Sequence, residues 1–276
     1  MFELPEYVVL ANQINKTLLG KKVHGGNLGN SPHKFVWYNR SQDEFNRLVK
    51  GKVVGEAKVR GRWLFIPLQP GYTLVFGECG GKILYHPAGK APPKKYHLFV
   101  NFTDETFITA TTQMWGAMEL YEQGQELKRE YIKDMQPTPL DPEFTYTYFD
   151  NLIQEAEAEK KRSVKSLLTQ DQLIPGLGNA IAQDILFQAR LHPRHSLSDL
   201  SSRQSKVLFD AILNTIDEII AGGGRYDEYD LFEQKGKYVR IMDKNALKSP
   251  CPRCAGEVKK IQYLGGSCYF CLNCQR

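Results

Sequence analysis

Cysteine is almost absent from the body of this 276-residue chain, since five of the six cysteines lie between Cys251 and Cys274 and only Cys79 stands apart. A secreted domain held by disulfides spreads its cysteines along the chain, so this distribution excludes that class and favours a metal site in a reducing, cytoplasmic compartment. No apolar run approaches the roughly 20 residues of a membrane span, so we expect no membrane partner. The opening MFELPE carries acidic residues and a proline, which is unlike a secretory signal peptide.

A large excess of charge of one sign is also missing, because 36 Lys and Arg residues face 31 Asp and Glu residues. The placement of the charge is uneven. The segment from Lys237 to Arg276 holds eight basic and two acidic residues, a net charge of +6, whereas the rest of the chain is near −1. A basic tail on a near-neutral body indicates a polyanionic partner, with a solvated basic surface as the alternative.

The first half of the chain has the pattern of a β domain that begins with a helix. Residues 5–19 (PEYVVLANQINKTLL) place apolar residues on one face, with Pro5 in the first turn and Gly20 at the end. Six strand-like runs separated by turn signals follow, which indicates a β-sandwich or barrel. These runs are residues 52–59, 63–68, 72–76, 82–85, 97–102 and 106–111.

The second half changes to a helical period after a proline-rich stretch. Residues 136–143 (QPTPLDPE) are typical of a linker, and helices are expected at 144–153, 161–168, 179–189 and 205–220. The glycine-rich, charged stretch 222–236 is expected to form a mobile loop. The predicted fold class is α+β, with a β-sandwich domain (1–135), the linker (136–143), a helical domain (144–236) and a small metal module (237–276).

The metal module is predicted from two CxxC pairs, Cys251/Cys254 and Cys271/Cys274, which are separated by sixteen residues. This spacing is typical of one zinc ion held by four thiolates at two turns of a β-hairpin, a structural site with no open coordination position. Cys268 and Cys271 also form a CxxC pair. We prefer Cys271 and Cys274 as ligands and expect Cys268 to remain a free thiol.

A short glycine-rich turn, Gln172 to Asn179 (QLIPGLGN), separates two predicted helices. Gly176 and Gly178 permit a tight turn and a close approach by another backbone, and Asn179 is a favourable N-cap. A helix N-terminus with small residues can bind phosphate, although a plain helix–helix connection is the alternative.

Three segments together resemble the formamidopyrimidine-DNA glycosylase and endonuclease VIII family. QDQLIPGLGNAIAQDILFQARLHP resembles the family's helix–two-turn–helix motif, the terminal CPRC…CLNCQR resembles its zinc finger, and ELPE at positions 3–6 resembles its N-terminal catalytic signature. The segments occur in the family's order and span the chain. The resemblance implies a monomeric, nucleoid-associated, two-lobed repair enzyme that binds damaged duplex DNA in a cleft and flips the damaged base out of the helix.

The resemblance also implies a mechanism in which an N-terminal secondary amine, from a proline after the initiator Met, attacks the sugar C1′. The base leaves, and elimination from a Schiff base then nicks the strand. An α-amine suits this work because its pKa of about 7.7–8.0 leaves a neutral fraction at pH 7. Glu3 and Glu6 match the family's carboxylates, but residue 2 is Phe2, which we expect to block the removal of Met1. The free amine would then lie on Met1, one residue away from its place in the family.

Several DNA-contacting positions are carried over from the same resemblance. Arg62 occupies the position of a phosphate-binding lysine of the family. Trp115 matches the family's aromatic residue that intercalates into DNA, and Gln113 replaces an arginine beside that aromatic. Lys165 resembles a lysine that faces phosphate, and Gly266 takes the place of an arginine at the tip of the finger. Without the resemblance, Trp115 would be assigned to the core and Lys165 to a solvated helix face.

Two functions therefore compete on the same fold. The first is a DNA glycosylase with AP-lyase activity on oxidised bases, and the second is a damaged-DNA-binding protein whose catalysis is impaired by the four substitutions Phe2, Arg62, Gln113 and Gly266. An unrelated zinc-ribbon protein that binds RNA or a protein partner is a third reading, but it leaves ELPE and the helix–two-turn–helix segment unexplained. Any residual activity of the second is expected as slow nicking at abasic sites.

Overall fold

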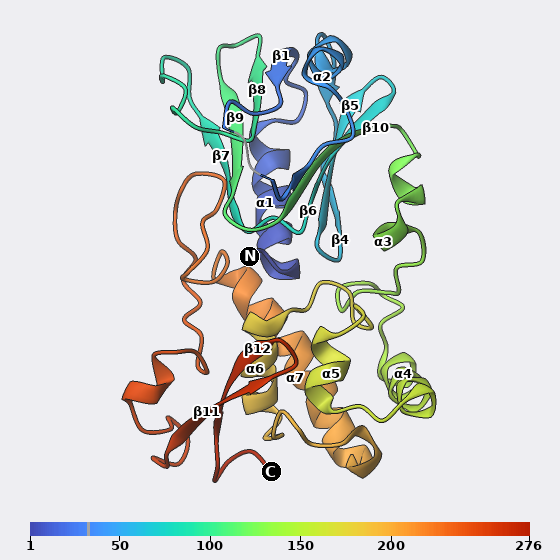
Figure 1. Cartoon of the computed structure of the whole chain (residues 1–276), viewed down its shortest axis with the longest axis vertical. Coiled ribbons are helices and arrows are strands. Elements are labelled where there is room, and N and C mark those ends of the chain that lie inside the picture. The colour runs from blue at the N-terminus through green and yellow to red at the C-terminus, as the bar shows by residue number, and fades with distance from the viewer. Residues whose placement is uncertain (32–33) are drawn as a thin grey trace. The chain divides into compact units, whose positions relative to one another are not determined.

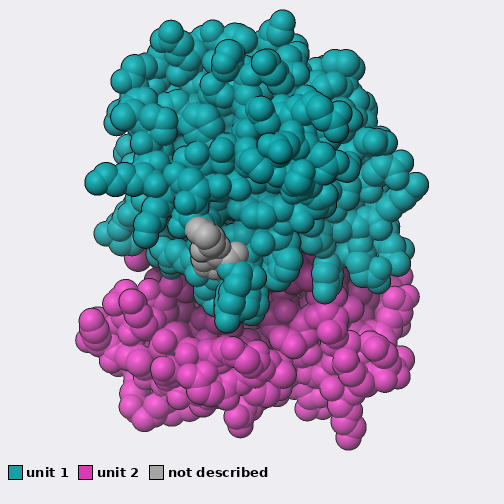
Figure 2. Space-filling model, turned by 45° about the horizontal axis from the view of Figure 1, so that its top comes forward, with its two compact units in different colours: residues 1–135, 219–238 teal, residues 136–218, 239–276 magenta. Residues whose placement is uncertain are grey.

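The computed structural model describes residues 1–31 and 34–276 (Figure 1). By its internal contacts, the chain forms two compact units (Figure 2). Unit 1 comprises residues 1–135 and 219–238, and unit 2 comprises residues 136–218 and 239–276. The domain boundaries predicted from the sequence were placed between motifs, and they stay a prediction. The two units, in contrast, are defined by contacts between residues. Within the described ranges, no helix is both long and apolar enough to cross a membrane.

Unit 1 begins with helix α1 (Leu4–Thr17), whose start is fixed by its own sequence. Glu3 is the N-cap and forms a capping box with Glu6, and Pro5 stands in the first turn. A capping box satisfies backbone N–H groups that the first helical turn cannot pair internally. The predicted helix is confirmed, and its capping residues are the two carboxylates of the ELPE segment.

Two sheets enclose α1 within unit 1, and their strands are antiparallel except where β2 pairs in parallel with β10. One sheet has the order β1–β8–β9–β7, and the other has β2–β10–β6–β5–β3, with β4 also paired to β5. The strands are β1 (Val23–Asn27), β2 (Val36–Trp37), β3 (Val53–Val54), β4 (Lys58–Arg60), β5 (Trp63–Gln69), β6 (Tyr72–Gly77), β7 (Gly81–His86), β8 (Leu98–Phe102), β9 (Phe107–Thr112) and β10 (Gly116–Glu122). Short helices α2 (Gln42–Val49) and α3 (Glu130–Lys133) and a turn of 3₁₀ helix at Glu126–Lys128 complete residues 1–135.

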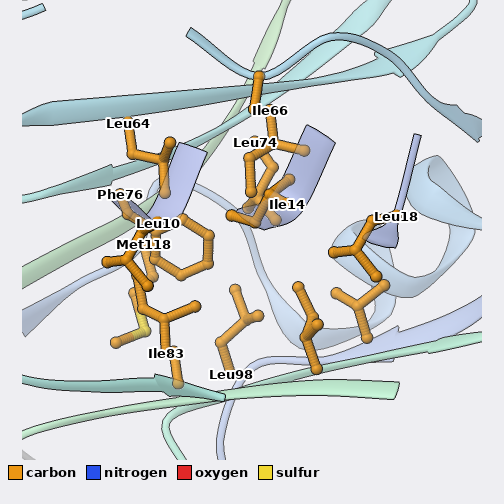
Figure 3. Packing of buried hydrophobic residues seen from close by; sticks show 14 of the residues in the cluster. Leu10, Ile14, Leu18, Leu64, Ile66, Leu74, Phe76, Ile83, Leu98 and Met118 are labelled. Atoms are coloured by element: carbon orange, nitrogen blue, oxygen red, sulfur yellow. The ribbon is translucent and has the colours of Figure 1, made fainter. Parts of the chain in front are cut away.

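The core of unit 1 is the space between the sheets, which the apolar face of α1 fills. Figure 3 shows Leu10 and Ile14 of α1 between side chains of the two sheets, such as Leu64 on one side and Leu98 on the other. Each of these residues is almost completely buried. Burying an aliphatic side chain of this size contributes about 1.5–3 kcal/mol, so the helix and both sheets depend on one another for stability.

Unit 2 contains the helices α4 (Tyr146–Glu159), α5 (Val164–Thr169) and α6 (Asn179–Gln188) and most of α7 (Ser202–Ala221). A turn of 3₁₀ helix covers Leu197–Asp199 before α7, and another covers Ala246–Lys248 before the terminal hairpin. That hairpin pairs β11 (Val258–Tyr263) with β12 (Gly266–Cys271). The predicted α+β class, with a sandwich, a helical region and a terminal hairpin, is confirmed.

Three local predictions need correction. The expected strand 52–59 is divided into β3 and β4, because residues 55–57 leave the ladder. Asn179 is the first residue of α6, and Gly178 occupies the N-cap position with no side-chain capping bond. The stretch 222–236 lies outside helices and strands as expected, but it is anchored rather than loose, since Arg225 and Leu231 are buried in unit 1.

Candidate active site and metal centre

Phe2 determines where the N-terminus of the chain lies. Its ring is fully buried and packs edge-on against Tyr7, with ring centroids 5.7 Å apart. Its backbone N–H donates to the Cys79 carbonyl at 3.0 Å, and the Cys79 N–H donates to the Tyr7 hydroxyl at the same distance. Residue 2 is therefore part of the core, and Met1, which is 41% exposed, is the first residue outside it.

The α-amine of Met1 faces a carboxylate from a distant part of the chain. Its nitrogen lies 2.6 Å from Oε1 of Glu228. Burial raises the pKa of the Glu228 carboxyl above its usual range, although the ammonium group of Met1 and the guanidinium of Arg225 oppose the shift. A carboxylate with a raised pKa is a better proton acceptor than an ordinary surface glutamate.

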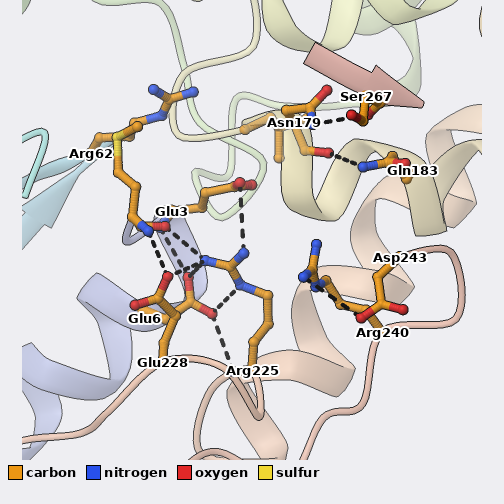
Figure 4. A network of polar contacts seen from close by, with 12 residues as sticks. Glu3, Glu6, Arg62, Asn179, Gln183, Arg225, Glu228, Arg240, Asp243 and Ser267 are labelled. Atoms are coloured by element: carbon orange, nitrogen blue, oxygen red, sulfur yellow. Dashed lines mark hydrogen bonds and ion pairs between the residues drawn. The ribbon is translucent and has the colours of Figure 1, made fainter. Parts of the chain in front are cut away.

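Arg225 organises the carboxylates around this amine, and Figure 4 shows its guanidinium at their centre. Its Nε and Nη2 donate to the two carboxylate oxygens of Glu6 at 2.8 and 2.9 Å, and Nη2 also donates to the Met1 carbonyl at 2.9 Å. Nη1 lies 3.8 Å from Oε1 of Glu3, and Nη2 lies 3.6 Å from Oε1 of Glu228. Burial alone would lower the pKa of Arg225, but the carboxylates of Glu6 and Glu3 outweigh it and raise the pKa.

This cluster, which we call the N-terminal charge cluster, consists of the Met1 amine, Glu3, Glu6, Arg225 and Glu228. The sequence identified the first three members. It missed Arg225 and Glu228, because only the fold brings residues more than 200 positions away to the start of α1. The mixture of glycine and charged residues in the stretch 222–236 is typical of a loop and gave no signal that two of its residues would join the cluster.

The loop before β10 lies next to Met1. A Cβ atom built on Gly80 would lie 3.7 Å from Cβ of Met1 and 3.9 Å from Cβ of Met114, so Gly80 separates the two side chains. The backbone N–H of Gln113 donates to the Gly80 carbonyl at 3.0 Å, and the N–H of Gly80 donates to the Trp115 carbonyl at 3.3 Å. Trp115 is 41% exposed, which contradicts the core assignment, and Gln113 is exposed as well.

Arg62 lies in the turn between β4 and β5 and is paired with Glu78, whose Oε2 accepts from Nη1 at 3.0 Å. Its side chain is 13% exposed. A phosphate group that approaches this guanidinium would have to compete with, or replace, the carboxylate of Glu78.

In unit 2, Lys165 is buried and its Nζ donates to the Tyr263 carbonyl of β11 at 2.5 Å. The assignment of Lys165 to a solvated helix face is therefore wrong. Asn179 Nδ2 donates to the Ser267 carbonyl of β12 at 3.2 Å (Figure 4). Within unit 2, these two bonds attach the tip of the hairpin to the helices.

The turn before α6 has the conformation that its glycines allow. Gly176 has a φ of +95°, which side chains disfavour, so the tight turn predicted there is confirmed. At the tip of the hairpin, a Cβ atom on Gly266 would lie 2.9 Å from Oδ1 of Asn179. A side chain at this position would therefore have to displace the Asn179 side chain that packs against the tip of the hairpin.

Four thiols in unit 2 form a metal-binding group. The Sγ atoms of Cys251, Cys254, Cys271 and Cys274 all lie within 4.8 Å of one another, with 3.8 Å between Cys251 and Cys274 and 3.5 Å between Cys254 and Cys271. Zinc–sulfur bonds of about 2.3 Å place the sulfurs of a tetrahedron roughly 3.8 Å apart, so the group fits zinc. The predicted cofactor, one structural zinc ion, is confirmed.

Two neighbours complete this metal centre. Cys268 is buried in β12 opposite Ile261 and is not a member of the group. Gln275 follows the last thiol, and its Oε1 accepts from the Cys271 N–H at 2.9 Å while its Nε2 donates to the Leu191 carbonyl at 2.9 Å. The side chain of Gln275 therefore orients one turn that carries thiols and anchors it to the helical region of unit 2.

Comparison with known proteins places this arrangement in a family. Residues 1–118 match the formamidopyrimidine-DNA glycosylase N-terminal domain, and residues 135–229 match the formamidopyrimidine-DNA glycosylase H2TH domain. The chain is 29% identical to the formamidopyrimidine-DNA glycosylase of Wolbachia sp. subsp. Brugia malayi and 25% identical to that of Bacillus licheniformis. Both alignments cover the whole of each chain.

Solved structures agree with these sequence matches. Lactococcus lactis Fpg in complex with DNA that contains a Fapy-dG is 25% identical, with a TM-score of 0.84 over 99% of this chain and all of that one. The same enzyme bound to DNA that contains an abasic site has a TM-score of 0.85 over 99% of both chains at 24% identity, which is a likeness of fold. With two consecutive domain matches, full-length relatives and a shared fold, this chain belongs to the formamidopyrimidine-DNA glycosylase family.

Proposed function

We propose that this protein is an active base-excision repair DNA glycosylase with AP-lyase activity and that its nucleophile is the α-amine of Met1. Membership of the family supports the reaction class. The observation that carries the choice of nucleophile is the contact of 2.6 Å between that amine and Glu228 within the N-terminal charge cluster. The alternative of a protein that only binds damaged DNA is not favoured, because an amine and both carboxylates of the ELPE segment are present together.

The first half of the proposed reaction releases the base. The neutral amine attacks C1′ of the damaged nucleotide, the N-glycosidic bond breaks, and its electron pair and a proton leave with the base. Glu3 gives a proton to the sugar ring oxygen as the ring opens and an imine forms between Met1 and C1′. Loss of a proton from C2′ then expels the 3′ phosphate and cuts the strand, and water hydrolyses the imine to return the amine.

Glu228 is the proposed proton acceptor for the amine. An ammonium group has no electron pair to donate, so Met1 must lose a proton before it attacks. The carboxylate of Glu228 lies within hydrogen-bonding distance of that proton, and its raised pKa reduces the cost of accepting it. Arg225 is a positioning residue in this scheme, because it binds the Met1 carbonyl and the carboxylate of Glu6 at once.

The proposed substrate is an oxidised base in duplex DNA. Trp115 would fill the space left by the extruded nucleotide with Gln113 beside it, and Arg62 would bind phosphate after release from Glu78. In unit 2, the helix start at residues 176–179 would receive phosphate, while Lys165 holds the hairpin in place. Four cysteine thiolates, Cys251, Cys254, Cys271 and Cys274, would hold the structural zinc. We further infer a monomer that acts in the cytoplasm at the nucleoid.

Borohydride trapping on a duplex with an abasic site tests the assignment of the nucleophile. Reduction of the imine gives a stable cross-link, and mass spectrometry of the cross-linked peptide should locate the DNA on the nitrogen of Met1. We expect Glu228→Gln to slow trapping, whereas the matched control Glu233→Gln, an exposed carboxylate of the same loop, should not. A cross-link on a lysine, or equal rates for both variants, would overturn the assignment.

The position of the amine also leads to a prediction of which half of the reaction is faster. An abasic sugar is already open to attack, whereas base release needs exact alignment with C1′. Since the amine lies one residue before the family's position, we expect abasic-site nicking to exceed the release of common oxidised bases by the wild-type protein. Single-turnover assays measure both steps, and rapid base release that Glu3→Gln abolishes would show that the amine is fully aligned.

A further inference from the structure

Three large aromatic side chains lie together on the surface of unit 1. Phe35, Trp37 and Trp115 are 38%, 45% and 41% exposed, and we call them the aromatic platform. The ring centroids of Phe35 and Trp115 are 5.1 Å apart, and the rings of Trp37 and Trp115 are parallel with centroids 6.3 Å apart. Isolated exposed aromatics are ordinary, but a contiguous group of three indicates a binding surface.

The backbone holds the platform in place from two sides. Strand β2 runs parallel to the start of β10, pairing Val36 with Gly116, and the Gly116 N–H donates to the Phe35 carbonyl at 3.1 Å. Val36 is buried, so its neighbours Phe35 and Trp37 project to the opposite, exposed face. The carbonyl of Trp115 accepts hydrogen bonds from Gly80 and from the Thr112 hydroxyl. The rings are therefore exposed but attached to ordered strands.

The platform is larger than the role given to Trp115 requires. One aromatic side chain is sufficient to fill the gap left by one extruded nucleotide. Phe35 and Trp37 extend the stacking surface beyond that gap, and Nζ of Lys34 lies 4.9 Å from the Phe35 ring, where it adds a positive charge beside the rings. Aromatic surfaces with nearby cations are typical of sites that bind single-stranded nucleic acid.

We propose that the aromatic platform stacks unpaired bases next to the lesion, so that this protein prefers damage in locally single-stranded or bubble DNA. The inference rests on the proposed function and specifies its substrate class. In a closed duplex the bases beside the lesion are paired and stacked on one another, so their faces are not available to stack on Phe35 and Trp37. In a bubble those bases are unpaired, and each stacking contact with a ring adds affinity.

Binding measurements on three DNAs test this proposal. Each DNA carries the same abasic-site analogue, placed in a closed duplex, in a bubble of unpaired bases or in a single strand. We expect wild-type protein to bind the bubble more tightly than the duplex. Trp37→Ala should weaken bubble binding by roughly 5- to 100-fold, which corresponds to the loss of one stacked base, and should change duplex binding by less than about threefold.

Two further variants separate stacking from folding. Trp37→Phe keeps an aromatic ring and should retain most of the bubble preference. Tyr131→Ala removes an aromatic that is 72% exposed elsewhere in unit 1 and should leave all three affinities unchanged. Thermal unfolding of each variant shows whether the fold survives, and a Trp37→Phe protein that folds but loses the preference would contradict stacking.

The outcomes distinguish this inference from the proposed function. If wild-type protein traps abasic duplex DNA but shows no bubble preference, or if Trp37→Ala weakens duplex and bubble equally, the platform proposal is wrong and the enzyme assignment stands. If sedimentation shows a dimer that Trp37→Ala dissociates, the platform is a subunit interface and the proposal is overturned. If wild-type protein neither binds nor traps abasic DNA, the proposed function itself fails.

Discussion

Replacing Arg225 with methionine removes the one guanidinium group that faces three carboxylates in the N-terminal charge cluster. The arginine side chain is 2% exposed, and those of Glu3 and Glu6 are 6% and 3% exposed. Removing one partner of a buried ion pair leaves the other charge without compensation and typically costs about 3–5 kcal/mol. We therefore expect Arg225→Met to lower the free energy of unfolding by about that amount at neutral pH.

The loss should depend on pH in a defined direction. Without Arg225, the pKa of the Glu228 carboxyl, which burial raises and that guanidinium lowers, rises further in the folded state. The folded variant then binds more protons than the unfolded chain, and its stability falls as pH rises. The loss of unfolding free energy relative to wild type should then be largest at neutral pH and should become smaller toward pH 5. Urea denaturation at both pH values measures it, and at a slope near 3 kcal/mol per M the midpoint at neutral pH should fall by roughly 1–2 M.

Two further variants test whether Arg225 stabilises the cluster by compensating buried charge. Lys133→Met breaks an exposed pair with Glu130 and should leave the stability nearly unchanged. Adding Glu6→Gln to Arg225→Met removes one uncompensated charge and should recover part of the loss. An Arg225→Met protein as stable as Lys133→Met, or one whose deficit does not change with pH, would show that the cluster is not held as described.

Four further outcomes are expected. Cys271→Ser should lose zinc by metal analysis and Cys268→Ser should keep it, so full zinc retention in Cys271→Ser would defeat the ligand assignment. The affinity for duplex DNA should fall with salt at a log–log slope of about −0.9 per phosphate neutralised, and Arg62→Gln should reduce that slope by about one phosphate if Arg62 leaves Glu78 for DNA. Trp115→Ala should weaken binding to abasic DNA more than to intact duplex, whereas equal losses would assign Trp115 a structural role only. Nicking should decline as pH falls through the raised pKa of Glu228, and Glu228→Gln should remove the contribution of that carboxyl to the acidic limb of the pH–rate profile, whereas the requirement for a neutral amine remains.

Much of the fold was predictable because its signals are local. The apolar spacing of α1, the alternation of the long strands and the spacing of CxxC pairs each depend on residues close in sequence. The short elements were missed for the same reason. Strand β2 has two residues, and its pairing with β10 comes from the fold, so no local pattern indicates it. Helix α2 was also missed, although Ser41 and Glu44 form a capping box at its start that could have been recognised in the sequence.

The candidate site was predictable only where a motif carried it. ELPE and the cysteine pairs were recognisable because their residues are adjacent, and the structure adds partners that no local pattern could supply. Glu228 reaches Met1 across 227 positions, and Trp37 meets Trp115 only because β2 lies beside β10. The role of Asn179 was also not predictable, because α6 begins at this residue instead of after it, and its Nδ2 donates to the Ser267 carbonyl of the hairpin.

The burial of Phe2 gives a physical reason for the position that we propose for the nucleophile. An amine on residue 2 would require that residue to carry the free N-terminus, yet here its N–H is bonded to Cys79 and its ring fills the core beside Tyr7. Phe2→Pro would remove this ring and this donor together, and large-to-small changes of a buried Phe cost about 3–5 kcal/mol. Restoring the family's proline would therefore destabilise the very segment that carries the amine. A nucleophile on Met1 would leave that packing intact and would need only a new proton acceptor at the displaced position, the role that we propose for Glu228.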